Sequence, residues 1–167
     1  MSVRTGIGYD THAFAAGRPL ILGGVDIPHE QGLIGHSDAD VLTHAIIDAL
    51  LGAAGLGDIG QHFPDTDPRH AGADSLAMLR TVVVLLEQHG FTVDHVDSTV
   101  VIERPKLAPY RGAMQKGIAN ALGVAVAGVN VKATTGEGMG FVGRGEGAAA
   151  MAVVTLTLED QRPRAIS

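Results

Sequence analysis

Two polar side chains near the start of the chain have the spacing of a chelating pair. Asp10 and His12 lie two residues apart, at the end of a stretch from Val3 to Asp10 that is typical of a strand. In an extended chain, residues two apart point to the same face. A carboxylate oxygen and an imidazole nitrogen held side by side can bind a divalent metal such as zinc.

A third ligand is available on the helix that is expected to follow. Ser37 and Asp40 form an acidic variant of a capping box and predict that a helix containing His44 begins here. Asp48, four residues after His44, is expected to accept the other ring N–H of that histidine. One apolar stripe runs along the helix, formed by Val41, Leu42, Ala45, Ile46, Ala49, Leu50 and Ala53. Three nitrogen or oxygen ligands with an open fourth position are typical of catalytic zinc.

The same residues also have a simpler interpretation. An Asp-x-His pair can be a hydrogen-bonded strand end, and a histidine beside an apolar stripe can be an ordinary core residue. The chain has no cysteine, so imidazole and carboxylate must hold any transition metal. Glycines, which let a backbone approach a ligand closely, cluster around the histidines and favour the metal site. They are Gly6, Gly8, Gly23, Gly24, Gly35, Gly52, Gly57 and Gly60.

Two segments in the second half could bind phosphate. Thr134 and Thr135 offer hydroxyls, and Glu137 offers a carboxylate suited to a hard cation such as Mg²⁺. Ordinary β-propensity also explains a Thr-Thr pair. The segment from Gly143 to Gly147 is either a turn with a surface ion pair or an anion site at Arg144, and composition does not decide between them.

The elements that must position these residues predict an α/β sandwich. An extended stretch is expected over 20–27, broken at Gly23 and Gly24 by a hairpin turn or a bulge. Helices are expected over 73–89 and 107–122, strands over 91–103, 129–135 and 148–158, and an exposed loop over 58–72. This alternation predicts helices packed on one face of a mixed sheet, which we expect in a ferredoxin-like topology. The length of 167 residues, 46% of them hydrophobic, fits one domain over 1–158 and a frayed tail over 159–167.

Charge and hydropathy exclude some partners. A net charge of -6 with only 12 Lys and Arg residues argues against nucleic acid. The longest apolar run, around Val82 to Leu86, is too short to span a bilayer, and no apolar signal core follows Met1, so a cytoplasmic protein is expected. A phosphorylated small molecule can still be a ligand if metal ions supply the positive charge.

Six collinear motifs resemble one family. The chain is similar to the 2-C-methyl-D-erythritol 2,4-cyclodiphosphate synthases of the non-mevalonate isoprenoid pathway, from about Arg4 to Leu158. The family also occurs fused to a cytidylyltransferase domain, and the length here implies the stand-alone form. The motifs are Gly8-Tyr9-Asp10-Thr11-His12-Ala13-Phe14, His36-Ser37-Asp38-Ala39-Asp40, Leu56-Gly57-Asp58-Ile59-Gly60, Phe63-Pro64-Asp65-Thr66-Asp67, Arg104-Pro105-Lys106 and Gly143-Arg144-Gly145-Glu146-Gly147.

The resemblance implies a homotrimer with active sites at subunit interfaces. Asp10, His12 and His44 would bind one Zn²⁺ per subunit, and Glu137 would bind a second divalent cation, Mg²⁺ or Mn²⁺. His36 and Thr135 would be catalytic, by stabilising the transition state. The implied substrate-binding residues on the sugar side are Asp10, His12, His36, Ser37, Asp58, Ile59, Gly60, Phe63, Pro64, Asp65, Thr66 and Asp67. Those for cytidine and its phosphates are Val101, Ile102, Glu103, Arg104, Pro105, Lys106, Leu107, Ala133, Thr134 and Thr135, and Gly136, Glu137, Phe141 and Arg144 complete the set.

Two positions depart from the family pattern. The family commonly has Thr where Gly136 stands, and often Thr where Val142 stands. The first departure could loosen the loop before Glu137. Neither removes a proposed ligand.

The implied activity is that of a phosphorus–oxygen lyase. It would convert 4-diphosphocytidyl-2-C-methyl-D-erythritol 2-phosphate to the 2,4-cyclodiphosphate with release of CMP. A phosphohydrolase that uses the same metal ligands to activate water is one rival. A non-catalytic trimer that stores metal or binds isoprenoid diphosphates is another. The cytidine motif at Pro105 and Lys106 speaks against both rivals. Whether isoprenoid diphosphates bind in a threefold cavity and regulate the protein is left open.

Overall fold

A five-stranded sheet forms one layer of the molecule. The computed structural model describes residues 1–159, so all but the first residue of the predicted frayed tail lies outside the described residues. The strand order is β4-β1-β7-β5-β6, in which β5 and β6 are parallel and the other pairs are antiparallel. The bounds are β1 (Ser2–Ala16), β4 (Gln31–Leu33), β5 (Phe91–Val101), β6 (Val129–Thr134) and β7 (Gly147–Leu158), and β2 (Leu20–Leu22) pairs with β3 (Val25–Ile27) in a separate hairpin.

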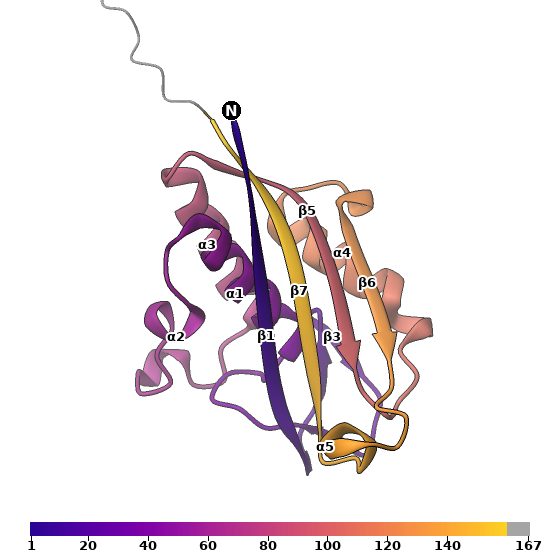
Figure 1. Cartoon of the computed structure of the whole chain (residues 1–167). Helices are drawn as coiled ribbons and strands as arrows, with labels where there is room; N and C mark the ends of the chain where they lie inside the picture. The colour runs from indigo at the N-terminus through magenta and orange to yellow at the C-terminus, as the bar shows by residue number, and fades with distance from the viewer. Residues whose placement is uncertain (160–167) are drawn as a thin grey trace, which may run out of the picture.

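Three long helices cover one face of this sheet (Figure 1). They are α1 (Val41–Ala54), α3 (Ser75–Gln88) and α4 (Arg111–Leu122). The short elements are α2 (Ile59–His62), α5 (Gly140–Gly143) and 3-10 turns over Pro68–His70, Ala108–Tyr110 and Val126–Gly128. The prediction of an α/β sandwich with helices on one face of a mixed sheet is confirmed.

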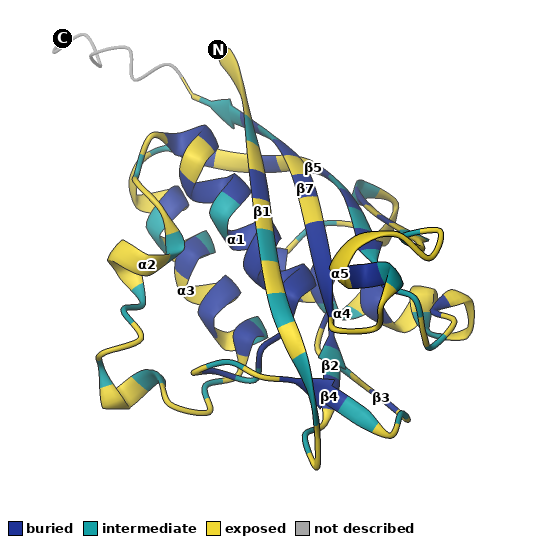
Figure 2. Cartoon of the chain, turned by 60° about the horizontal axis from the view of Figure 1, so that its bottom comes forward, coloured by how far each residue is buried: buried dark blue, intermediate teal, exposed yellow. Residues whose placement is uncertain are grey.

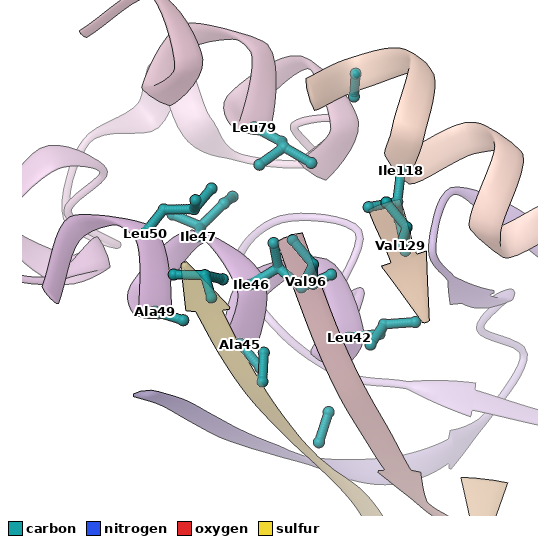
Figure 3. Close-up of a cluster of buried hydrophobic side chains, with 14 of the residues drawn as sticks. Leu42, Ala45, Ile46, Ile47, Ala49, Leu50, Leu79, Val96, Ile118 and Val129 are labelled. Atoms are coloured by element: carbon teal, nitrogen blue, oxygen red, sulfur yellow. The ribbon is translucent and has the colours of Figure 1, made fainter. Parts of the chain in front are cut away.

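The helix α1 lies at the centre of the core. It contacts β1 and β7 on one side and α3 on the other, and it is buried along most of its length (Figure 2). Leu42, Ile46 and Leu50 pack in one cluster with Val96 and Leu79 (Figure 3). The predicted single apolar stripe was therefore too narrow, since α1 buries residues around most of its circumference. A helix that is hydrophobic all round is typical of a position inside the core.

Glycines in β1 let α1 lie directly on the sheet. A Cβ atom at Gly6 would overlap the backbone oxygen of Ala49, and one at Gly8 would overlap that of Ala45. Only glycine permits this approach of helix to strand. The close contact brings His44 of α1 beside Asp10 of β1.

The predicted capping box at Ser37 is wrong, because α1 is capped by Asp40. The Asp40 carboxylate accepts from the backbone N–H and the hydroxyl of Thr43, at 3.0 and 2.8 Å. It also accepts from the backbone N–H groups of Gly23 and Gly24, at 2.9 and 2.8 Å. One buried side chain thus ties the β2–β3 turn to the first turn of α1, and its burial raises the pKa of Asp40.

The predicted ferredoxin-like topology is also wrong. That topology runs β-α-β-β-α-β along the chain. Here α4 lies between β5 and β6, and β7 follows β6 with only the one-turn helix α5 between them. Because a long helix connects β5 to β6, the two strands can lie parallel at one edge, while β7 pairs between β1 and β5.

Candidate active site and metal centre

Three ligand atoms from two elements converge near the middle of β1. The Asp10 Oδ2 atom lies 3.0 Å from His12 Nε2 and 3.1 Å from His44 Nδ1. The two ring nitrogens are 3.3 Å apart. For zinc bonds of 2.0–2.1 Å, neighbouring ligands of a tetrahedral site are separated by about 3.3 Å. The three separations therefore suit a metal bound on one triangular face of a tetrahedron.

In the neutral form of each ring, the outer contacts favour a proton on the nitrogen that faces away from the cluster. His12 Nδ1 lies 2.8 Å from the backbone oxygen of Ile34, so Nδ1 must carry a proton, and in the neutral ring Nε2 faces the cluster with its lone pair. His44 Nε2 faces the hydroxyls of Ser75 and Ser37, at 2.8 and 3.0 Å. With the proton of His44 on Nε2, two nitrogen lone pairs and a carboxylate oxygen point at one another. In that form the three atoms can hold a divalent cation, and the donor set fits zinc.

The pKa shifts of Asp10 and His12 show that the cluster attracts positive charge. Burial raises the pKa of Asp10, but hydrogen bonds and charges of His12 and His44 outweigh it and lower the pKa to about 2. Burial lowers the pKa of His12, and its contact with Asp10 outweighs that and raises it. The site favours positive charge next to a carboxylate that stays ionised at neutral pH.

The predicted partner of His44 is wrong. Asp48 does not bind the His44 ring, and its carboxylate instead accepts the backbone N–H of Ile59 at 3.0 Å. The His44 ring points toward the beginning of α3, because helical side chains lean toward the N-terminus of their own helix. Asp48 lies one turn further on and holds the start of α2, which forms a wall of the neighbouring cavity.

A cavity of about 510 Å³ opens beside the three candidate metal ligands Asp10, His12 and His44, and we call it the metal cavity. The predicted residues that line it are Asp10, His12, His36, Ser37, His44, Ile59, Gly60, Phe63, Pro64 and Asp65. The structure adds Gly35, one of the glycines that the sequence placed around the histidines, and also His70 and Met78, which the sequence did not indicate. His70 packs edge-on against Phe63, with ring centroids 5.4 Å apart. A histidine three residues after Asp67 in a polar loop was the only available signal for it.

Three predicted sugar-side residues lie around this cavity without lining it. Asp58 caps α2 by accepting the N–H of Gln61, and the backbone oxygen of Asp67 lies 3.0 Å from His36 Nε2. The Asp67 carboxylate binds the guanidinium of Arg69, which lowers its pKa to about 2. Thr66 lies between Asp65 and Asp67 in the same loop. These residues shape the wall that carries His36 and His70.

Most of the residues predicted to bind cytidine line a second, smaller cavity, which we call the cytidine cavity after that prediction. It has a volume of about 200 Å³, and the metal cavity shares no lining residue with it. The predicted residues in it are Ile102, Glu103, Pro105, Lys106, Leu107, Ala133, Thr134 and Thr135, and the structure adds Ala108 and Arg111. Val101 ends β5 outside it, and Arg104 lines a different cavity together with Arg144.

The loop that carries Glu137 is held by Glu103, which lines the cytidine cavity. The Glu103 carboxylate accepts from the backbone N–H groups of Gly136 and Gly138, at 2.9 and 3.0 Å. The N–H of Glu137 donates to the Thr135 hydroxyl, and Glu137 has a positive φ of 53°. Its carboxylate is exposed and lies outside both the metal cavity and the cytidine cavity of the same chain.

The remaining predicted residues, Phe141 and Arg144, lie in and just after α5, directly before β7. Phe141 of α5 lines a cavity with Tyr9 and Thr11 of β1. Arg144 pairs with Glu146, with 2.7 Å between Nε and Oε1. That ion pair is what a plain surface turn would show, so within one chain Arg144 is not aimed at the metal cavity.

Comparison with known proteins gives consistent matches. The model of the YgbB family matches residues 3–157. A 2-C-methyl-D-erythritol 2,4-cyclodiphosphate synthase from Syntrophobacter fumaroxidans is 59% identical over 142 residues, which are 85% of this chain and 89% of the relative. One from Burkholderia thailandensis is 58% identical over 144 residues, 86% and 89% of the two chains.

Solved structures show the same fold. The bifunctional IspDF of Campylobacter jejuni matches with a TM-score of 0.91 and 45% identity, over 95% of this chain and 43% of that one. A Plasmodium falciparum IspF in complex with CDP matches with a TM-score of 0.83 and 30% identity, over 95% and 98% of the two chains. Within residues 1–159, no helix is both long and apolar enough to cross a bilayer.

Proposed function

Because the chain belongs to the YgbB family and acts as a 2-C-methyl-D-erythritol 2,4-cyclodiphosphate synthase, we propose that its two cavities hold the two ends of one substrate. The substrate would be 4-diphosphocytidyl-2-C-methyl-D-erythritol 2-phosphate. Its sugar and 2-phosphate would occupy the cavity beside Asp10, His12 and His44, and its cytidine the cavity at Lys106 and Thr135. We infer that residues 1–158 form the catalytic unit.

One observation carries this assignment, which is the convergence of three metal ligands on a cavity without strong side-chain cations. The described residues that line this cavity include no Lys or Arg. A substrate with three phosphorus centres therefore needs metal ions for charge neutralisation. Zn²⁺ bound by Asp10, His12 and His44 would polarise the phosphate at which the reaction occurs.

The reaction needs no nucleophile from the protein. An oxygen of the substrate's 2-phosphate forms a bond to the β-phosphorus, and the bond from that phosphorus to the bridging oxygen breaks, so CMP leaves with the electron pair. The nucleophile is already an anion and is tethered to its target. The protein's task is therefore to fold the substrate for in-line attack and to stabilise the transferring group.

Side chains of the sugar-side cavity suit this task. His36 is held by the backbone oxygen of Asp67, and in its protonated form it can donate from Nδ1 to a phosphate oxygen. His70 adds a second imidazole on the same wall and Ser37 a hydroxyl. We assign His36 to the 2-phosphate and the transition state, and Thr135 to the cytidine diphosphate side.

A complete site would require a neighbouring subunit. The metal and cytidine cavities of one chain share no lining residue, so the second half is expected from another copy in a homotrimer. The sheet face opposite the helices supports such assembly, because it exposes apolar side chains along β1 and β7. They are Val3, Ile7, Tyr9, Met151 and Val153. The family resemblance also allows an isoprenoid diphosphate in the threefold cavity, with Arg144 near the axis to bind phosphate.

We assign Glu137 as the residue that would hold a second divalent cation, Mg²⁺ or Mn²⁺, which would supply positive charge to the substrate's phosphates. Glu137→Gln is expected to lower activity roughly 100-fold at limiting Mg²⁺, the scale of losing one charge-stabilising contact. Zinc content should be unchanged, because no zinc ligand lies on this loop, and added Mg²⁺ should restore part of the rate. Glu87→Gln, at an exposed site on α3, is the matched control. Wild-type turnover of Glu137→Gln at limiting Mg²⁺ would refute the assignment.

Phosphorus NMR of the purified protein with the proposed substrate tests the function directly. The expected products are a cyclic diphosphate and CMP in equal amounts. A linear phosphorylated product with release of inorganic phosphate would instead indicate a metal-dependent phosphohydrolase. Binding without any new phosphorus signal would indicate a non-catalytic protein.

A further inference from the structure

The outer nitrogen of the His44 ring meets a buried hydroxyl that leads to a carboxylate. Ser75, the first residue of α3, is fully buried, and its Oγ lies 2.8 Å from His44 Nε2. The Ser75 hydroxyl donates to Asp38 Oδ1, and the Ser75 backbone N–H donates to Asp38 Oδ2 at 3.0 Å. His44 is thus connected to Asp38 through one side chain.

Asp38, at the end of this series of hydrogen bonds, determines which atom donates in each of them. Asp38 is a carboxylate and can only accept, so the Ser75 hydroxyl proton points toward it. The Ser75 oxygen then accepts a hydrogen bond donated by His44 Nε2–H. This order keeps the lone pair of His44 on Nδ1, the atom that lies 3.1 Å from Asp10 Oδ2.

Ser37 and the other metal-binding histidine have no such arrangement in the described chain. Ser37 Oγ also lies near His44 Nε2, but it accepts its other hydrogen bond from the backbone N–H of Ala39 rather than donating to a carboxylate. The outer nitrogen of His12 binds the backbone oxygen of Ile34, which carries no charge. Of the two rings at the candidate metal site, that of His44 alone is connected to a carboxylate of the described chain through its outer nitrogen.

We propose that Ser75 and Asp38 are positioning residues for the metal centre. The charge of Asp38, passed through the Ser75 hydroxyl, holds the His44 ring in one tautomer and orientation and makes Nδ1 a stronger ligand. Outer partners of metal-binding histidines commonly act in this way. The inference rests on the metal site of the proposed function but not on the reaction, and it makes the N-terminus of α3 part of the metal site.

The test measures metal binding by the metal-free protein, without substrate. Ser75→Ala and Asp38→Asn are each expected to weaken zinc affinity about 10- to 100-fold in competition with a chelator. The double variant should lose no more than the stronger single variant, because both act through the same contact. Asp74→Ala is the matched control, since Asp74 caps α3 at the neighbouring residue without contacting His44. It should keep wild-type zinc affinity.

Cobalt spectra separate positioning from a general structural effect. The visible bands of the Co²⁺-loaded protein should change in Ser75→Ala and Asp38→Asn and stay unchanged in Asp74→Ala. Ser75→Thr, which keeps the hydroxyl, should regain most of the affinity. If Ser75→Ala does not fold, Asp38→Asn decides alone, because it leaves the Ser75 hydroxyl in place. Wild-type zinc affinity and cobalt bands in folded Asp38→Asn would overturn the proposal, whatever phosphorus NMR shows of the reaction.

Discussion

His44→Ala is expected to give a folded protein that no longer retains zinc and has lost at least about 100-fold of its activity. The reason is geometric, because within residues 1–159 three ligand atoms converge here, one from His44 and the other two from β1. Two ligands two residues apart on a strand leave a weak, open site. Elemental analysis of the purified variant and the rate of CMP release measure both losses.

The fold should survive this substitution. The core around α1 is formed by its apolar residues, and the contact between Ser75 and Asp38 does not need the imidazole. We expect the free energy of unfolding of the metal-free protein to fall by about 1–3 kcal/mol. His89→Ala, at the exposed C-terminal end of α3, is the matched histidine control and should keep full zinc. Full zinc occupancy in folded His44→Ala would remove His44 from the site.

Co-refolding two inactive variants is expected to restore activity. His44→Ala damages the zinc half of the proposed interfacial site and Thr135→Ala the cytidine half. In a mixed trimer, a site is intact when a Thr135→Ala chain supplies the zinc half and a His44→Ala chain supplies the cytidine half. With random mixing, the probability that a given site receives each intact half is about one half. Roughly a quarter of wild-type activity should therefore return in a closed ring of head-to-tail contacts.

A control pair distinguishes complementation from refolding artefacts. His44→Ala mixed with His12→Ala should stay inactive, because both variants lack the zinc half. Native mass spectrometry confirms that mixed trimers form. If the mixture of His44→Ala and Thr135→Ala is no more active than its parents in such trimers, the two cavities serve one chain and the interfacial model is wrong.

Predictions from local sequence patterns succeeded where neighbours in sequence determine the outcome. In the strand expected over 91–103, the alternation of Val96, Ser98, Val100 and Ile102 predicts one buried face. All four are buried, although β5 ends at Val101 and Ile102 follows it. The hairpin over 20–27 turns at Gly23 and Gly24 as expected, with positive φ at both. The three-residue strand β4 was missed, because so short a segment with Gly32 at its centre has no detectable period.

The sequence by itself determined the ligand types, the sandwich of helices on one sheet face and the family, because each depends on residue identity, local period or collinear motifs. The contacts of His44 were decided only by the tertiary structure. Asp10, Ser75 and Asp38 meet around this ring from separate elements, and no local spacing encodes their approach. Strand order was decided in the same way, because β7 pairs between β1 and β5 through contacts distant in sequence. Packing of whole elements, allowed here by Gly6 and Gly8 beneath α1, brings such residues together.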